Sequence, residues 1–262
     1  DKLLLITRGK QGLQRAPFFD NDHQVEIFVD RIIWDLEQPK IDFDMAVNES
    51  AAIVESRDFY KEVRYERISR GMLAYHPLSK MRDFVIQWRQ REFTFSEYAG
   101  WMGSKQTYLK PQIIELADLG YIFYNPETDS IKVRRKLDHA VLSHMELADY
   151  DVIRLRSVIA ARPNAHLSLI NNNLTVEGVR AFRFSDSQSV YAFPHNQTVI
   201  LKSKRRMEFG GRVTAGKFDF FSDRFDFDYY TSHTTKTYFL ITKRKEIQDT
   251  AKCEKHIICF KQ

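Results

Sequence analysis

The alternation of apolar and polar residues predicts β-strands in the first part of the chain. Val25, Ile27 and Val29 stand at alternate positions, residues 32–34 continue the apolar run, and residues 41–45 alternate again after a turn at 37–40. A period of two places one face of each strand against a core and the other toward water. With a further strand at 51–54, residues 1–57 are predicted to form an N-terminal β segment.

From about Phe59 the apolar spacing changes to the helical period of about 3.6 residues. Pro77 is suited to the first turn of a helix, and its apolar stripe follows at Met81, Phe84, Val85 and Trp88. A second helix is predicted from residue 95, a turn at 103–105, and a third helix that ends at Gly120, which caps it.

Residues 121–133 follow this pair of helices with the pattern of a β-hairpin, and residues 137–147 predict one more helix. The order helix, turn, helix, hairpin is typical of a winged helix. The sequence therefore predicts a winged-helix-like helical module over residues 58–148.

After Asp151 the β pattern returns, with short alternating runs at 174–176, 199–201 and 225–229. Turn signals recur every 8 to 12 residues or so, which is typical of a sandwich, a jelly roll or stacked β-structure. We therefore expect an α+β protein, β-rich, with an inserted winged-helix-like module and a second β segment at 149–231. Residues 232–262 form an atypical basic tail, for which a frameshift, a truncated reading or a poorly ordered end are the alternatives.

Charge gives little support for a nucleic-acid partner. The net charge is +5, but the tail alone holds seven basic and three acidic residues, so the remainder is close to neutral.

Both cysteines, Cys253 and Cys259, lie in the tail, so the body has neither a disulfide nor a Cys-ligated metal. No apolar run is long enough for a transmembrane segment, and residues 3–6 are too short for a signal peptide. Because the chain begins with Asp1, we expect a fragment with any targeting segment upstream.

A DNA-binding winged helix would need exposed cations on its third helix and beside its hairpin. The candidate residues for this alternative are Lys105, Lys110, Arg134, Arg135 and Lys136. Glu115 and Asp118 offset the lysines of the helix, and Glu127 and Asp129 would place negative charge on the hairpin. The competing interpretation is a helical packing module within a β-rich protein.

The other polar clusters do not form a catalytic or metal-binding pattern. Asp219, Asp223, Asp226 and Asp228 alternate with aromatic residues as on the solvent face of a strand, and lack a Gly-bearing calcium loop. His139 and His144 are five residues apart, and His256 between the two cysteines lacks a fourth ligand. Residues 185–187 have no nucleophile motif around them, and Gly210 and Gly211 indicate a bulge or turn. We therefore assign no catalytic, metal or cofactor-binding residue and expect no cofactor.

Several stretches resemble a family of very large, uncharacterised bacterial proteins that are exported and β-rich. They are residues 101–105 (WMGSK), 119–124 (LGYIFY), 129–133 (DSIKV), 149–154 (DYDVIR), 184–190 (FSDSQSV) and 209–218 (FGGRVTAGKF). The resemblance covers roughly residues 25–230 and brings no catalytic residues. It implies an internal fragment of an envelope protein in the periplasm or cell envelope, with other domains of the same polypeptide or envelope proteins as partners. The alternative is a cytoplasmic DNA-binding regulator with a β-rich sensor half.

Overall fold

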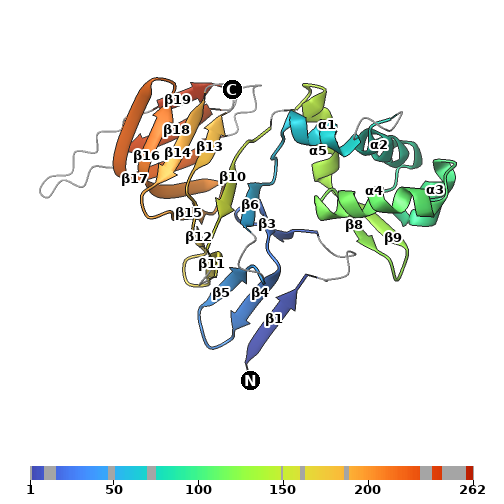
Figure 1. Ribbon diagram of the computed structural model, residues 1–262, viewed down its shortest axis with the longest axis horizontal. Helices are drawn as coiled ribbons and strands as arrows, with labels where there is room; N and C mark the ends of the chain where they lie inside the picture. The colour runs from blue at the N-terminus through green and yellow to red at the C-terminus, as the bar shows by residue number, and fades with distance from the viewer. Residues whose placement is uncertain are drawn as a thin grey trace, which may run out of the picture. The chain divides into compact units, whose positions relative to one another are not determined.

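A computed structural model divides the chain into two compact units, which are described separately (Figure 1). The structure describes residues 2–8, 16–46, 51–69, 75–148, 150–159, 163–185, 189–230, 238–243 and 258–261. The β-unit combines Asp1–Thr7, Phe18–Ser56 and Val152–Gln262, and the helical unit combines Arg8–Pro17 and Arg57–Asp151.

The β-unit consists of strands throughout its described part. These are β1 (Leu3–Thr7), β2 (Phe18–Asp20), β3 (Val25–Phe28), β4 (Arg31–Asp35), β5 (Lys40–Asp44), β6 (Ala52–Ser56), β10 (Arg154–Ser157), β11 (Ala165–Ser168), β12 (Leu174–Val176), β13 (Phe182–Ser185), β14 (Val190–Pro194), β15 (Val199–Lys202), β16 (Arg206–Ala215), β17 (Phe218–Tyr230), β18 (Tyr238–Lys243) and β19 (Ile258–Lys261). The last two strands lie in the tail, where the sequence did not predict them.

Most of these strands belong to one large antiparallel sheet. Its order is β1-β4-β5-β11-β12-β15-β16-β17-β18-β19, with β14 joined to β16 and β13 joined to β14. A smaller sheet has the order β10-β6-β3-β2 and is also antiparallel. These sheets confirm the predicted β-rich class.

Alternating burial along the long strands builds an aromatic core for the β-unit. Phe209 of β16 lies opposite Phe225 of β17, and both are buried. Phe184 of β13 is fully buried, with its ring centroid 4.6 Å from that of Phe227. Large rings bury extensive apolar surface in such a core, which is the main favourable term in its stability.

Gly210 and Gly211 lie in a β-bulge, which is one of the two alternatives, bulge or turn, that the sequence indicated. The register between β16 and β17 shifts between Phe209 and Gly211. A Cβ atom on Gly210 would lie 2.2 Å from the main-chain oxygen of Asp223, and one on Gly211 would lie 2.2 Å from that of Phe193. Only glycine permits so close an approach of neighbouring strands.

The chain leaves the β-unit and returns to it through two neighbouring strands. β6 pairs antiparallel with β10, and the Ser56 N–H donates to the Ile153 oxygen at 3.1 Å. Just inside the helical unit, the Tyr60 N–H donates to the Asp151 oxygen at 2.9 Å. Because entry and exit are adjacent, the segment Arg57–Asp151 is an insertion that leaves the pairing of the smaller sheet intact.

The part of the helical unit that the structure describes contains five helices and a three-stranded antiparallel sheet. Its elements are α1 (Glu62–Ser69), α2 (Pro77–Trp88), β7 (Glu92–Thr94), α3 (Phe95–Trp101), α4 (Gln106–Asp118), β8 (Ile122–Asn125), β9 (Ser130–Val133) and α5 (Arg135–His144). The sheet order is β7-β9-β8. The four predicted helices and the hairpin are confirmed, whereas α1 and β7 are additions to the prediction.

Local signals in the sequence explain where these helices begin and end. Thr94 and Glu97 form a reciprocal capping box at the start of α3. At the end of α4, Gly120 has a φ of 77°, and its N–H and that of Tyr121 donate to Ala117 and Leu116. This is a Schellman motif, as expected for a helix capped by glycine.

None of the helices in the described part of the chain has the length and apolar character of a membrane span.

Candidate functional site

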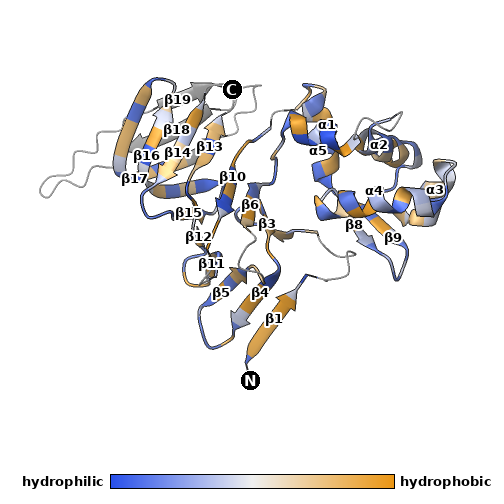
Figure 2. Cartoon of the chain, viewed as in Figure 1, coloured by the Kyte–Doolittle hydropathy of each residue, from blue (hydrophilic) through white to orange (hydrophobic). Residues whose placement is uncertain are grey.

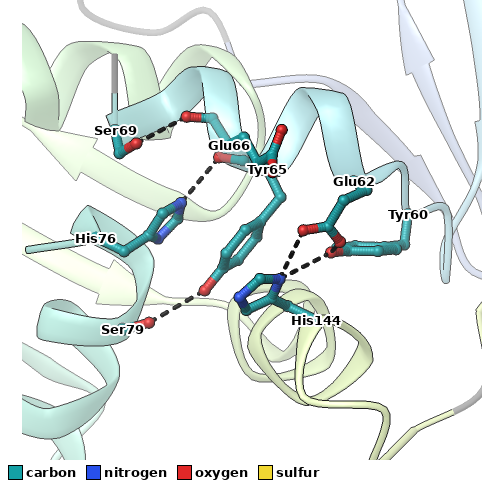
Figure 3. Close-up of polar contacts among 8 residues, drawn as sticks. All are labelled: Tyr60, Glu62, Tyr65, Glu66, Ser69, His76, Ser79 and His144. Atoms are coloured by element: carbon teal, nitrogen blue, oxygen red, sulfur yellow. Dashed lines mark hydrogen bonds and ion pairs between the residues drawn. The ribbon is translucent and has the colours of Figure 1, made fainter. Parts of the chain in front are cut away.

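A tyrosine sandwiched between two histidines joins α1, α2 and α5 in the helical unit (Figure 3). The ring of Tyr65 stacks on His76 with centroids 3.8 Å apart and planes at 4°, and on His144 with centroids 4.3 Å apart and planes at 20°. Tyr65 is buried, and its hydroxyl lies 3.1 Å from the Ser79 Oγ. The three residues therefore form one stack, called the Tyr65 stack, that connects three helices.

His76 uses both ring nitrogens inside this stack. Its Nε2 lies 2.8 Å from the Tyr65 main-chain oxygen, and its Nδ1 accepts a hydrogen bond from the Leu78 N–H at 3.3 Å. A neutral ring with the proton on Nε2 satisfies both contacts, so His76 acts as the N-cap of α2. Burial, with a contribution from nearby His144, lowers the pKa of His76 below its ordinary value.

His144 is oriented by a carboxylate on α1. Its Nδ1 lies 2.8 Å from Glu62 Oε1 and 3.5 Å from the Tyr60 hydroxyl, which also donates to Glu62. A carboxylate–imidazole pair of this kind is suited to general-base chemistry. However, burial raises the pKa values of Tyr60 and Tyr65, so both hydroxyls stay protonated, and Ser79 bonds to Tyr65 instead of an imidazole. These contacts favour a structural role for the Tyr65 stack, which holds α1, α2 and α5 together, over a catalytic one.

The sequence did not predict this stack. Tyr65, His76 and His144 come from three elements, and His144 was considered only as a metal ligand together with His139. The one available signal is His76 directly before Pro77, since an N-cap residue followed by proline is typical of a helix start.

The lysines proposed for DNA contact lie at the beginning of α4. Lys105 is the N-cap residue, its side chain makes no capping hydrogen bond, and both Lys105 and Lys110 are exposed. Tyr108 lies between them and is 75% exposed. Pro111 is exposed on the same half of the helix, so this surface combines an aromatic ring, a proline and two cations.

Two of the three cations after the hairpin are used inside the helical unit. Arg134 Nη1 donates to the Gly120 oxygen at 2.7 Å, and the guanidinium carbon lies 5.0 Å from the Phe123 ring centroid. Lys136 is buried at 6% exposure, and its Nζ donates to the Leu119 oxygen at 2.9 Å. Both cations thus complement the negative end of the α4 dipole. Arg135, between them, is exposed.

Asp129, one of the two acidic residues of the hairpin, also has an internal role. Asp129 Oδ2 accepts hydrogen bonds from the Ser96 N–H at 3.1 Å and from the Ser96 hydroxyl at 2.8 Å. Gln106 Nε2 lies 3.4 Å from the same oxygen. Asp129 therefore connects the hairpin to the starts of α3 and α4, whereas Glu127 is exposed.

No group of three metal-ligating side chains occurs in the described part of the chain. Asp219, Asp223, Asp226 and Asp228 lie along β17, Ser185 ends β13, and Cys259 lies in β19. The remaining candidates Asp186, Ser187, Cys253 and His256 lie outside the described residues.

No protein-family model, curated protein or solved structure matches the chain. The resemblance to large exported envelope proteins remains an expectation from the sequence.

The N-cap role of His76 predicts acid sensitivity of the helical unit. Because the pKa of His76 in the folded protein lies below the ordinary 6.5, folding favours the neutral ring. The free energy of unfolding is then highest above about pH 6.5 and falls as the pH decreases toward the folded-state pKa. His76→Asn keeps a capping acceptor that does not titrate, so its pH dependence should be weaker.

Denaturant unfolding followed by tryptophan fluorescence measures this difference. A Trp34→Phe background leaves Trp88 and Trp101, both in the helical unit, as reporters. Reporting on the helical unit alone is necessary because His23 of the β-unit also has a shifted pKa. Burial lowers the pKa of His23, but the contacts with its neighbours, the hydrogen bond to Asp20 foremost, outweigh this effect and the pKa is raised. Equal pH dependence with and without His76 would contradict the N-cap role.

The internal role of Lys136 predicts unequal effects of two neighbouring substitutions. Lys136→Met keeps the aliphatic stem but leaves the Leu119 oxygen without its charged donor, which should lower the free energy of unfolding by about 1–3 kcal/mol. Arg135→Met should change it by less than about 0.5 kcal/mol, because Arg135 is exposed. Equal losses in urea unfolding would show that the internal contact does not matter.

Proposed function

We propose that this chain is a non-enzymatic structural and interaction segment of a large envelope-associated protein, and that its helical unit binds protein. The observation that carries this proposal is that Arg134 and Lys136, two of the five candidates for DNA contact, bond to main-chain oxygens inside the helical unit. The resemblance to exported proteins supports a location in the periplasm or cell envelope. Its partners are then other domains of the same polypeptide or envelope proteins.

We further propose that the helical unit is a winged-helix-like module. The succession α2–β7–α3–α4–β8–β9, with the sheet order β7-β9-β8, supports this assignment. In such a module α4 takes the position of the recognition helix and the β8–β9 hairpin that of the wing.

The exposed surface of α4 suits a protein partner. Tyrosine supplies a large contact area at low entropic cost and is enriched among residues that dominate binding energy. Tyr108 stands out from α4 with Pro111 one turn along the helix, and Lys105 and Lys110 flank it. We therefore place the centre of the contact at Tyr108.

A photo-crosslinking amino acid at position 108 tests this surface in the host cell. We expect a protein adduct at Tyr108 and none at Val63, a control on α1 that is 66% exposed. Tyr108→Ala should then weaken binding of the purified partner about tenfold or more, since truncating an anchor costs at least about 1.4 kcal/mol. Equal adduct yields at both positions, or an adduct with nucleic acid, would contradict the proposal.

DNA binding is the second candidate function, favoured by the exposed lysines at the start of α4. Under this alternative, Lys105→Glu with Lys110→Glu should weaken duplex binding and reduce the salt slope by about two, one unit for each lost phosphate contact. The matched control is Lys61→Glu with Arg67→Glu, two exposed cations at α1. Our proposal predicts that fluorescence anisotropy will show equal, weak binding for both variants.

A further inference from the structure

Strand β1 is an apolar edge strand that is exposed along its whole length. All five residues, Leu3–Thr7, are exposed, with Leu3 at 61% and Leu5 at 52%. Figure 2 shows the hydrophobic character of this strand. Among the described strands, β1 pairs with β4 alone. Proteins usually protect such an edge with a lysine, a proline or a bulge. β1 has none of these between Leu3 and Thr7, so the strand is suited to a partner.

The free backbone groups of β1 belong to every second residue. The Leu36 N–H donates to the Lys2 oxygen at 2.8 Å, and Leu3 lies opposite Asp35 in the antiparallel register. Hydrogen-bonded pairs alternate along an antiparallel ladder, so Leu4 and Ile6 bond to β4. Leu3, Leu5 and Thr7 therefore direct their N–H and C=O groups away from the sheet.

The two faces of this part of the sheet differ in polarity. Leu4 and Ile6 lie opposite Trp34 and Ile32, on the face that leads through Phe43 to the core of the β-unit. On the other face, Lys40 pairs with Asp42 at 3.0 Å and Arg31 pairs with Asp44. An added strand must therefore continue one apolar and one mixed face.

We infer that β1 pairs with β1 of a second copy of this chain, antiparallel about a twofold axis at Leu5. In this register Leu3 faces Thr7, Leu4 faces Ile6, and Leu5 faces its own copy. Odd-numbered residues face odd-numbered residues and even-numbered residues face even-numbered ones, so paired side chains lie on the same face of the sheet. The apolar face of Leu4 and Ile6 therefore continues across the pair. In this register the outward N–H and C=O groups of Leu3, Leu5 and Thr7 on one strand form hydrogen bonds with those of Thr7, Leu5 and Leu3 on the other.

Charge is compatible with this self-pairing. The five residues of β1 carry none, so no like charges meet within the strand pair. Lys2 would approach Arg8 of the other copy just beyond the strand, and Glu37, 3.0 Å from Lys2 Nζ, offsets that repulsion. A twofold pairing is closed, so each dimer covers both copies of the edge.

Sedimentation equilibrium of the 262-residue chain tests the inference, which does not depend on the proposed role of the helical unit. The wild type should form a dimer of twice 31.0 kDa within about 1–100 µM. Leu5→Lys and Leu5→Glu should each be monomeric, because like charges would face each other on the axis. An equimolar mixture should dimerise again.

Leu36→Lys provides the matched control, since Leu36 is 53% exposed but lies outside β1. This variant should remain dimeric, and circular dichroism should show that every variant is folded. A wild type that is monomeric at all concentrations, a mixture that stays monomeric, or equal effects of Leu5→Lys and Leu36→Lys would overturn the inference.

Discussion

The helical unit depends on how the carbonyl end of α4 is satisfied. Lys136 and Arg134 donate to the oxygens of Leu119 and Gly120, so the start of α5 and the end of β9 are fixed to the last turn of α4. A buried ammonium group is costly unless it is paired, and here the helix dipole and the Tyr121 ring, 5.3 Å away, supply the compensation. The same contacts bind both cations inside the helical unit, and the burial of Lys136 disfavours its contact with an external phosphate.

The sequence predicted those elements whose apolar pattern is long enough to be unambiguous. The stripe from Met81 to Trp88 and the alternation of β3 and β5 are of this kind. Strand β7 was missed because three residues carry no detectable period, although Phe93 is buried. The order of the large sheet could not be predicted, since it depends on pairs distant in sequence such as β5 with β11.

At the candidate site, too, the sequence predicted some features and missed others. The sequence placed Arg134, Arg135 and Lys136 together, but adjacency in sequence does not reveal which side chain is buried. A signal was available, because Lys136 precedes the buried Ala140 by four residues and therefore lies on the same face of α5. The Tyr65 stack had no comparable signal, since it depends on tertiary packing of three helices.

We propose that α4 contacts protein and that neither α4 nor the β8–β9 hairpin binds duplex DNA. Hydrogen–deuterium exchange with and without a duplex tests it most directly, at low salt where phosphate contacts are strongest. We expect unchanged exchange over residues 105–118 and 122–136. Slower exchange confined to these segments when DNA is added would contradict it.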